Sequence, residues 1–239
     1  PLVVPELNPQ AILKHKGIIA NPNCSTIIMV MALKPIYDLA KIKRVIVSTY
    51  QAVSGAGKEG IDELDAQVRE HSEGREMTAN ILPSASAEKH YPIAFNLIPQ
   101  IDVFCDNLYT KEEMKMVNET KKIMEDYEMR ITATTIRVPV YRSHSESVNI
   151  ELEKEVDLGV MREALAKFPG VTVQDDPSKQ EYPMPLYTSE KDDVYVGRLR
   201  RDESCEKSYN MWVVGDQIRK GAALNTLQIA ETMIKNGWI

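Results

Sequence analysis

The sequence predicts an α+β fold, with a largely antiparallel mixed sheet and helices on one face. Strand-like segments follow one another directly along the chain, as residues 130–140 and 147–153 do, which favours antiparallel pairing. Helical patterns stand apart from these strands, the last of them at residues 217–235. A chain of 239 residues, 43% of them hydrophobic, is also long enough to bury a core without disulfides or a structural metal.

Composition and charge exclude several classes of protein. The longest unbroken apolar run, residues 27–33, is far shorter than the roughly 18 residues that a membrane-spanning helix needs. A net charge of −6 argues against a nucleic-acid-binding surface, which is usually basic. The widely spaced Cys24, Cys105 and Cys205 fit free thiols in a reducing compartment rather than disulfides or a zinc site. We therefore expect a cytoplasmic protein with no metal and no membrane or nucleic-acid partner.

The first half of the chain mixes strand-like and helical segments. After a strand-like pattern at 17–20, Asn21-Pro22 breaks the chain, and the apolar segment that follows predicts a helix beginning at Cys24. Residues 44–50 are rich in β-branched side chains, which is typical of a strand. The rest of this half consists of a predicted helix at 61–70 and a long irregular stretch, functional or interfacial, at 71–109.

A capped helix opens the second half of the chain. Thr110 and Glu113 have the spacing of a capping box, and apolar residues from Met116 onward follow a helical period. The last helix carries one apolar stripe, formed by Ala223, Leu227, Ala230 and Ile234. The segments between these helices are predicted as strands at 130–140, 147–153 and 171–173, a helix at 160–168, and an antiparallel pair at 193–201 and 209–215.

Cys24 is a candidate nucleophile because of its place at a predicted helix start. The free N–H groups and the positive end of the helix dipole there favour the thiolate, which is the reactive form of cysteine. The same N–H groups suit an oxyanion or a phosphate. A small buried residue without a chemical role is an equally good interpretation of a lone cysteine.

His144 and Arg137 are candidates for proton transfer and for anion binding. His144 stands in the predicted turn between two strands, where its ring can present a nitrogen for proton transfer near neutral pH. Arg137 lies among apolar neighbours in the strand leading into this turn, so it needs an anionic partner such as a carboxylate. An exposed turn histidine and a structural salt bridge are the alternatives.

Two further patterns carry weaker signals. Residues 55–60 match the glycine spacing of a dinucleotide-binding turn, but no second strand with an acidic end follows about 20 residues later, so we reject a Rossmann motif here. The backbone of this loop remains able to touch a cofactor. One face of the capped helix carries alternating charges, typical of a solvated surface with weak charge pairs, at Glu112, Lys115, Glu119 and Lys122.

Seven longer segments, taken in order, make a more specific signal than any single motif. They are NPNCST, STYQAVSGAG, KHYPIAFNLIPQID, EEMKMVNETKKIM, RVPVYRSHSESVNIELE, VGRLRRD and MWVVGDQIRKGAALNTLQIAE. Together they resemble aspartate-semialdehyde dehydrogenase, most closely the form of Gram-positive bacteria, over nearly the whole chain. The resemblance implies NADPH-dependent reductive dephosphorylation of L-aspartyl 4-phosphate to aspartate semialdehyde, on the route to diaminopimelate, lysine, methionine and threonine. It also implies a fold similar to the C-terminal domain of glyceraldehyde-3-phosphate dehydrogenase-like enzymes, and a homodimer or a dimer of dimers.

The resemblance also implies a role for each residue that matches a family motif. Cys24 would form an acyl-thioester, His144 would be the acid or base, and Gln51 would orient the bound acyl group. Hydride from NADPH would then reduce the thioester. Arg137 would bind the α-carboxylate of the substrate, Glu112 its amino group, and Lys115 and Asn23 its phosphate. Ser54 and Gly55 would contact NADP, and Asn225 would lie beside the nicotinamide.

The sequence departs from the family pattern at its beginning. The family starts with a Rossmann domain that carries a glycine-rich phosphate loop and a phosphate-binding arginine, and neither is found here. We therefore expect 1–22 to be the end of an NADP-binding domain with its linker, 23–216 the catalytic and dimerisation domain, and 217–239 a helix that packs on the missing domain. Such a truncated chain would carry the chemistry without the hydride source.

Three other functions stay open at this point. N-acetyl-γ-glutamyl-phosphate reductase uses similar chemistry on an acetylated substrate, and Glu112 argues against it because a carboxylate suits a free ammonium. A non-catalytic dimerisation module fits a chain without a phosphate loop, and its last helix would expose an apolar stripe. A cysteine hydrolase is the weakest alternative, because no protease signature adjoins Cys24.

Overall fold

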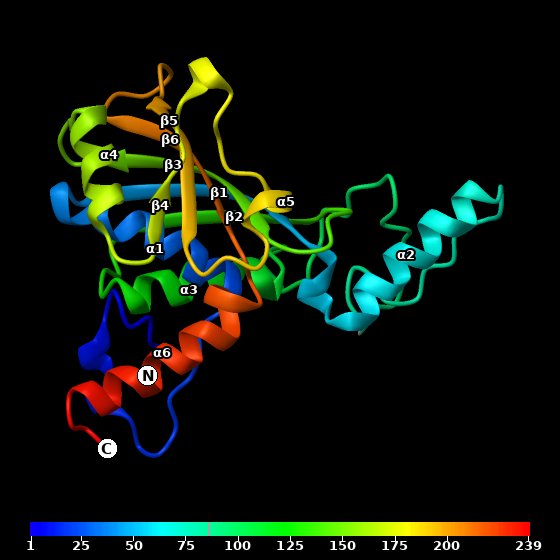
Figure 1. Cartoon of the computed structure of the whole chain (residues 1–239), viewed down its shortest axis with the longest axis horizontal. Coiled ribbons are helices and arrows are strands. Elements are labelled where there is room, and N and C mark those ends of the chain that lie inside the picture. The colour runs from blue at the N-terminus through cyan, green and yellow to red at the C-terminus, as the bar shows by residue number, and fades with distance from the viewer. Residues whose placement is uncertain (86) are drawn as a thin grey trace.

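A six-stranded sheet with the strand order β2-β1-β3-β6-β5-β4 is the framework of the fold. The computed structural model describes residues 1–85 and 87–239 (Figure 1). The four central strands pair antiparallel, and the two edge strands β2 and β4 join in parallel. The predicted mixed, largely antiparallel sheet is thus confirmed. The strands are β1 (Ile42–Gln51), β2 (Arg130–Arg137), β3 (His144–Leu152), β4 (Val171–Val173), β5 (Val194–Arg201) and β6 (Ser208–Gly215).

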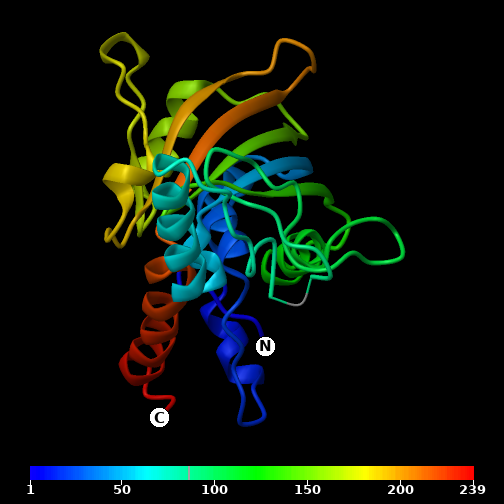
Figure 2. The same cartoon turned by 90° about the vertical axis from the view of Figure 1, so that its right-hand side faces the viewer.

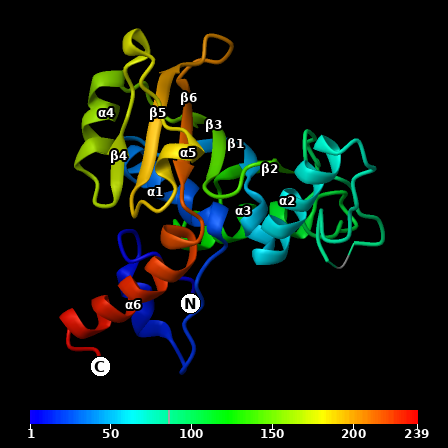
Figure 3. The same cartoon turned by 45° about the vertical axis from the view of Figure 1, so that its right-hand side comes forward.

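Helix α1 (Cys24–Leu39) forms the centre of the core. Its residues 27–33 are fully buried, because the helix is apolar on every side and is enclosed by the sheet, α3 (Lys111–Ile123) and α4 (Leu158–Lys167). A helix of this kind is stable only inside a core. The three helices pack together on one face of the sheet, as predicted (Figure 3). The short helix α5 (Pro185–Thr188) lies next to β6, where Trp212 donates a hydrogen bond to the Pro183 carbonyl over 3.1 Å.

An arm projects sideways from the sheet, formed by α2 (Lys58–Ser72) and the irregular segment that follows it (Figures 1 and 2). Side chains of α2 satisfy the backbone of this segment. The Glu63 carboxylate accepts hydrogen bonds from the N–H groups of Asn80 and Ile81, and the Gln67 carbonyl accepts from those of Ile93 and Ala94. These hydrogen bonds therefore hold residues 80–81 and 93–94 of the segment against the helix.

The two ends of the chain pack against each other below the sheet (Figure 1). The 3₁₀ helix η1 (Pro9–Lys14) contacts α6 (Leu224–Lys235) through a small apolar cluster that includes Ile12 and Ile229. The strand predicted at 17–20 is reduced to one bridge between Leu2 and Ala20, because no longer partner strand runs beside it. The predicted apolar stripe on the last helix is exposed, with Leu227 57% and Ile234 65% accessible.

The last helix also differs from the prediction in its first turns. It begins as a π-helical turn, η4 (Arg219–Ala223), before continuing as α6. Such turns widen a helix locally and often occur beside functional sites. Across the described residues, no helix combines the length and the apolar character that a bilayer span requires.

The buried hydroxyl of Tyr209 provides a test of the sheet's packing. It donates to the Val156 carbonyl over 2.7 Å and accepts from the Val156 N–H over 2.9 Å, with no exposed surface. Tyr209→Phe leaves both peptide groups unpaired, so we expect the free energy of unfolding to fall by about 1–3 kcal/mol. Tyr127→Phe is the matched control, because Tyr127 is 69% exposed. Equal urea midpoints for the two variants would contradict the expectation.

Candidate active site

Three of the predicted site residues lie side by side at one end of the sheet. In the strand register, Gln51 of β1 is paired with Arg137 of β2, and Tyr50 is paired with Ser145, which places His144 of β3 next to Gln51. Side chains alternate along a strand, so these three share the face that α1 covers. Gln51 is 2% exposed, Arg137 3% and His144 0%.

Cys24 reaches this row from above, as the first residue of α1. The helix start follows from its N-cap, because the Asn23 side-chain oxygen accepts a hydrogen bond from the Thr26 N–H over 3.0 Å. The turn η4 packs against Cys24. A Cβ atom added to Gly221 would lie 2.8 Å from the Cys24 Cβ, so only glycine allows this close approach.

The thiol of Cys24 is held in its protonated form. Burial and the nearby Glu112 carboxylate raise its pKa to about 12, and the Ser25 N–H and the Arg137 guanidinium lower it by less. The sequence predicted that the helix start would favour a thiolate. The helix N–H acts in that direction, but desolvation of a charge on this half-buried thiol outweighs it.

His144 corrects a second expectation, since it is the first residue of β3 and not part of the turn before it. Pairing of His144 with Gly215 of β6 extends the strand to this point. Its Nδ1 accepts a hydrogen bond from the Ala52 N–H over 3.0 Å, which places the ring proton on Nε2. Burial and the Arg137 charge hold the pKa of His144 well below its usual range. The ring is therefore neutral and presents an Nε2–H that has no partner among the described residues.

Arg137 and Glu112 face the same space from the sheet and from α3. Arg137 donates from Nη1 to the Ala52 carbonyl over 2.8 Å, while its Nε has no hydrogen-bond partner within the described part of the chain. The Glu112 carboxylate accepts from the Asn23 amide over 2.8 Å and from the Gln51 amide over 3.3 Å. A buried cation and a buried anion thus lie near Cys24. This pair suits a ligand that carries both a carboxylate and an ammonium group.

Lys115 stands at the rim of the same space. It is one turn after Glu112 on α3, and its ammonium lies 3.4 Å from the Glu112 carboxylate and 3.3 Å from that of Asp102. Nearly half of its side chain is exposed, so the ammonium can turn toward an incoming anion at little cost.

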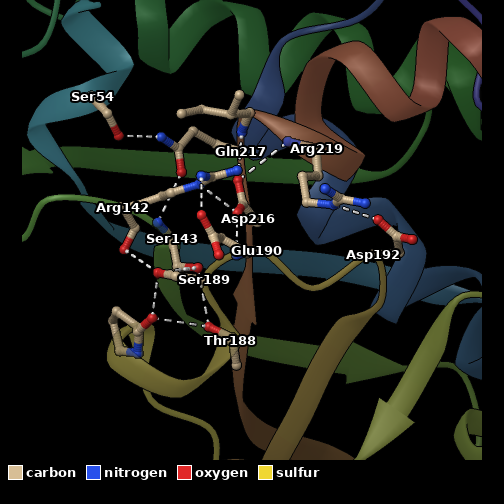
Figure 4. A network of polar contacts seen from close by, with 12 residues as sticks. Ser54, Arg142, Ser143, Thr188, Ser189, Glu190, Asp192, Asp216, Gln217 and Arg219 are labelled. Atoms are coloured by element: carbon tan, nitrogen blue, oxygen red, sulfur yellow. Dashed lines mark hydrogen bonds and ion pairs between the residues drawn. The ribbon is translucent and has the colours of Figure 1, made fainter. Parts of the chain in front are cut away.

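A network of polar contacts fixes the loop after β1 against the start of β3 (Figure 4). Gln217 is its centre: the side-chain oxygen accepts from the Ser143 N–H over 3.0 Å, and the amide donates to the Ser54 hydroxyl over 2.5 Å. Asp216 accepts from the Glu190 N–H over 2.7 Å and forms an ion pair with Arg142. Ser54 and the glycine after it are held beside His144 in this way.

Gly55 lies flat against two side chains of the row. A Cβ atom there would be 2.6 Å from the Arg137 Nη1 and 3.3 Å from the His144 Nε2. Only glycine therefore allows the backbone to approach the Arg137 and His144 side chains this closely.

Asn225 is the predicted site residue that the structure does not bring to this row. It is fully buried between the two ends of the chain, where its amide donates to the Val3 carbonyl over 2.9 Å and to the Asn21 side chain over 2.8 Å. Its oxygen accepts from Lys220 over 3.1 Å. A place for Asn225 beside a nicotinamide stays a prediction.

The chain is similar in sequence to known proteins. The family model described as semialdehyde dehydrogenase, dimerisation domain, matches residues 33–220. An aspartate-semialdehyde dehydrogenase from Aquifex aeolicus is 55% identical over 241 aligned positions, covering 100% of this chain and 69% of its own length. The chain belongs to the aspartate-semialdehyde dehydrogenase family. The members of this family are oxidoreductases.

Solved structures support the same assignment. An aspartate semialdehyde dehydrogenase II from Vibrio cholerae, complexed with ASA, superimposes with a TM-score of 0.91 at 46% identity, over 98% of this chain and 68% of the other. An aspartate semialdehyde dehydrogenase from Candida albicans, solved with NADP, has a TM-score of 0.72 at 24% identity and covers 100% of this chain and 68% of that one. The second likeness concerns the fold alone. No cluster of three or more metal-binding side chains occurs in the portion of the chain that the structure describes.

Glu146 is a site residue that the sequence reasoning missed in this member of the aspartate-semialdehyde dehydrogenase family. It lies on β3 two residues after His144, opposite Thr49, with no exposed surface. Neither carboxyl oxygen has a hydrogen-bond partner among the described residues, and burial holds its pKa well above the usual range. Its charge, when present, would raise the pKa of Cys24 further. The alternation of apolar and polar residues along this strand predicts that every second side chain is buried, and this pattern was the sequence signal that could have identified Glu146.

Gly221 offers a test of the approach between η4 and Cys24. Gly221→Ala forces the two backbones apart, so we expect turnover by the full-length enzyme to fall by about 10- to 100-fold, because misplacing a reacting group by 1 Å costs that much. Gly159→Ala is the control, since a Cβ there meets only the end of the Asp157 side chain. Steady-state kinetics with a thermal melt of each variant measure the effect. Wild-type turnover in Gly221→Ala would contradict it.

Proposed function

We propose that this chain carries out the acyl-transfer and reduction chemistry of aspartate-semialdehyde dehydrogenase on L-aspartyl 4-phosphate, with Cys24 as nucleophile. The observation that carries the proposal is the position of Cys24, at a helix start within electrostatic range of Arg137 and Glu112. Membership of the family supports it. By this assignment the product is aspartate semialdehyde, on the route to diaminopimelate, lysine, methionine and threonine.

Substrate binding is assigned to the charged side chains near Cys24. Arg137 takes the α-carboxylate and Glu112 takes the ammonium, so the free amino acid end of the substrate is fixed. Gln51, between them on β1, orients the acyl carbonyl. Lys115 at the rim takes the phosphate. Asn23 stays a weaker assignment for the phosphate, because its amide already donates to Glu112.

The first chemical step forms a thioester on Cys24. The sulfur attacks the acyl carbon, the bond from carbon to the phosphate oxygen breaks, and the phosphate leaves with the proton of the thiol. The positive end of α1 and the Arg137 charge offset the high pKa of the thiol as the sulfur gains negative charge.

His144 acts as an acid in this scheme. Its Nδ1 is occupied by the Ala52 N–H, so Nε2 carries a proton and cannot accept one until it has given that proton away. Nε2–H is therefore suited to donate a hydrogen bond to the oxygen that gains negative charge when hydride adds to the thioester. When the carbonyl double bond forms again, the carbon–sulfur bond breaks, and the aldehyde leaves Cys24 as a thiolate.

The loop of Ser54 and Gly55 fits the nicotinamide end of NADP. Gly55 packs against His144, whose Nε2–H has no partner among the described residues, and the network around Gln217 fixes the loop. NADPH supplies the hydride when it is bound. Gln217 is assigned to the cofactor together with Ser54 and Gly55. Asn225 keeps its sequence-based assignment beside the nicotinamide.

The domain organisation is part of the same proposal. Residues 23–216 form the catalytic and dimerisation domain, and 217–239 with 1–22 form the side that packs on an NADP-binding domain. The exposed stripe with Leu227 and Ile234 is the contact surface for that domain. A second copy of the chain packs on the sheet face opposite α1, where the rings of Tyr50 and Trp212 lie 5.5 Å apart. A cytoplasmic location without metal completes the proposal.

Cys24→Ala tests the nucleophile. We expect the full-length variant to lose phosphate-dependent reduction of NADP by aspartate semialdehyde to less than about 0.1% of wild type, because removing a covalent nucleophile costs several powers of ten. Cys205→Ala, at an exposed cysteine, is the matched control. Absorbance at 340 nm follows both. Retention of several per cent of activity in Cys24→Ala would contradict the assignment.

Glu112 decides between aspartyl phosphate and the acetylated substrate of the related reductase. We expect the enzyme to reduce L-aspartyl 4-phosphate and not N-acetyl-γ-glutamyl phosphate, since an acetamide offers the Glu112 carboxylate no positive charge. Glu112→Gln should raise KM for aspartyl phosphate by about 10-fold, the loss of one buried charge pair. Faster reduction of the acetylated substrate would favour the reductase instead.

A further inference from the structure

Two carboxylates of α3 hold the residue that precedes Cys24. Glu112 and Glu119 are seven residues apart, two turns along the helix, so they lie on the same face. Glu112 accepts from the Asn23 side-chain amide over 2.8 Å, and Glu119 accepts from the Asn23 peptide N–H over 2.7 Å. The charged face of α3 is therefore a clamp on the start of α1 and not a solvated surface.

All four polar groups of Asn23 are used. Its carbonyl accepts the first helical hydrogen bond, from the Ile27 N–H over 2.9 Å, and its side-chain oxygen caps Thr26. Its amide goes to Glu112, and its N–H goes to Glu119. The hydrogen bond to Glu119 is the one that ties the main chain of the N-cap to a different helix, and such charge-assisted bonds are about twice as strong as neutral ones.

Glu119 itself is placed to keep this bond. Half-buried, it has the opposite charges of Lys115 and Lys122 within one turn on either side, and the like charge of Glu112 two turns away. Burial raises its pKa above the usual value, and the Asn23 N–H opposes that rise. The N–H is thus part of what keeps a partly desolvated carboxylate in place.

We propose that Glu119 is a positioning residue for Cys24, acting through the Asn23 N–H to fix the first turn of α1 above the row of Arg137, Gln51 and His144. The inference rests on the proposed role of Cys24 as nucleophile. Glu119 binds the main-chain N–H of Asn23 and leaves the Asn23 side-chain amide, which is the group available to a substrate, to Glu112. Its loss should therefore lower turnover while leaving substrate binding nearly unchanged.

Three variants of the full-length protein test this positioning role. Glu119→Ala removes the acceptor, Glu119→Gln keeps a neutral acceptor of the same shape, and Asn118→Ala changes an exposed neighbour on the same helix. We expect Glu119→Ala to lower kcat by about 10-fold with a change in KM below about 2-fold, and Glu119→Gln to restore most of kcat. Asn118→Ala should match wild type.

A second readout does not depend on the activity. Iodoacetamide labelling, resolved by peptide mass spectrometry, gives the reaction rate of each cysteine separately. When the first turn of α1 frays, water reaches the half-buried thiol and its pKa falls, so we expect labelling of Cys24 in Glu119→Ala to rise several-fold relative to the exposed Cys205. Lower turnover with a more reactive thiol is the signature of a misplaced nucleophile.

The outcomes separate this inference from the proposed function. An unchanged labelling ratio in Glu119→Ala, an equal rise at the half-buried Cys105, or a Glu119→Gln variant as impaired as Glu119→Ala would each overturn the positioning role. An active Cys24→Ala enzyme would overturn the nucleophile instead, and the labelling ratio would still report whether Glu119 holds the helix start.

Discussion

The hydrogen bonds of Asn23 are the constraint on which the candidate site depends. This residue is the N-cap of α1, and its main chain and side chain together bind α1 itself and two carboxylates of α3. Cys24 follows it directly, so any rotation of the cap moves the sulfur. The core packing of α1 fixes the helix axis, but the cap fixes where the helix begins. For a nucleophile in the first turn, that second constraint is decisive.

Burial sets the protonation states in the site. It raises the pKa of the Cys24 thiol and of the Glu146 carboxyl and lowers that of the His144 ring, because a charge on any of them would be poorly solvated. The guanidinium of Arg137 and the carboxylate of Glu112 match the two charges of an amino acid. On the proposed function, the charged side chains therefore bind the substrate, and the reacting groups stay neutral until the substrate carbonyl is bound.

Several elements were predictable because a local pattern decides them. The helix start at Cys24 follows from a breaker and an apolar run, and the capping box of Thr110 and Glu113 is present as predicted. His144 was misplaced in a turn because the strand that extends to it is defined by pairing with Gly215, 71 residues later. Glu119 looked like a solvated charge for a similar reason, since its partner Asn23 is 96 residues away in the chain.

The sequence by itself determined the fold class, the helix with Cys24 at its start and, through its resemblance, the family. These depend on periodicity, caps and the order of motifs, which are all local or collinear. The tertiary structure alone decided which residues meet: the row of Arg137, Gln51 and His144, the unpaired Glu146, the burial of Asn225 and the clamp on Asn23. Strand register and helix docking bring distant residues within hydrogen-bonding distance. Only after that does desolvation set their pKa values, and with them the chemistry.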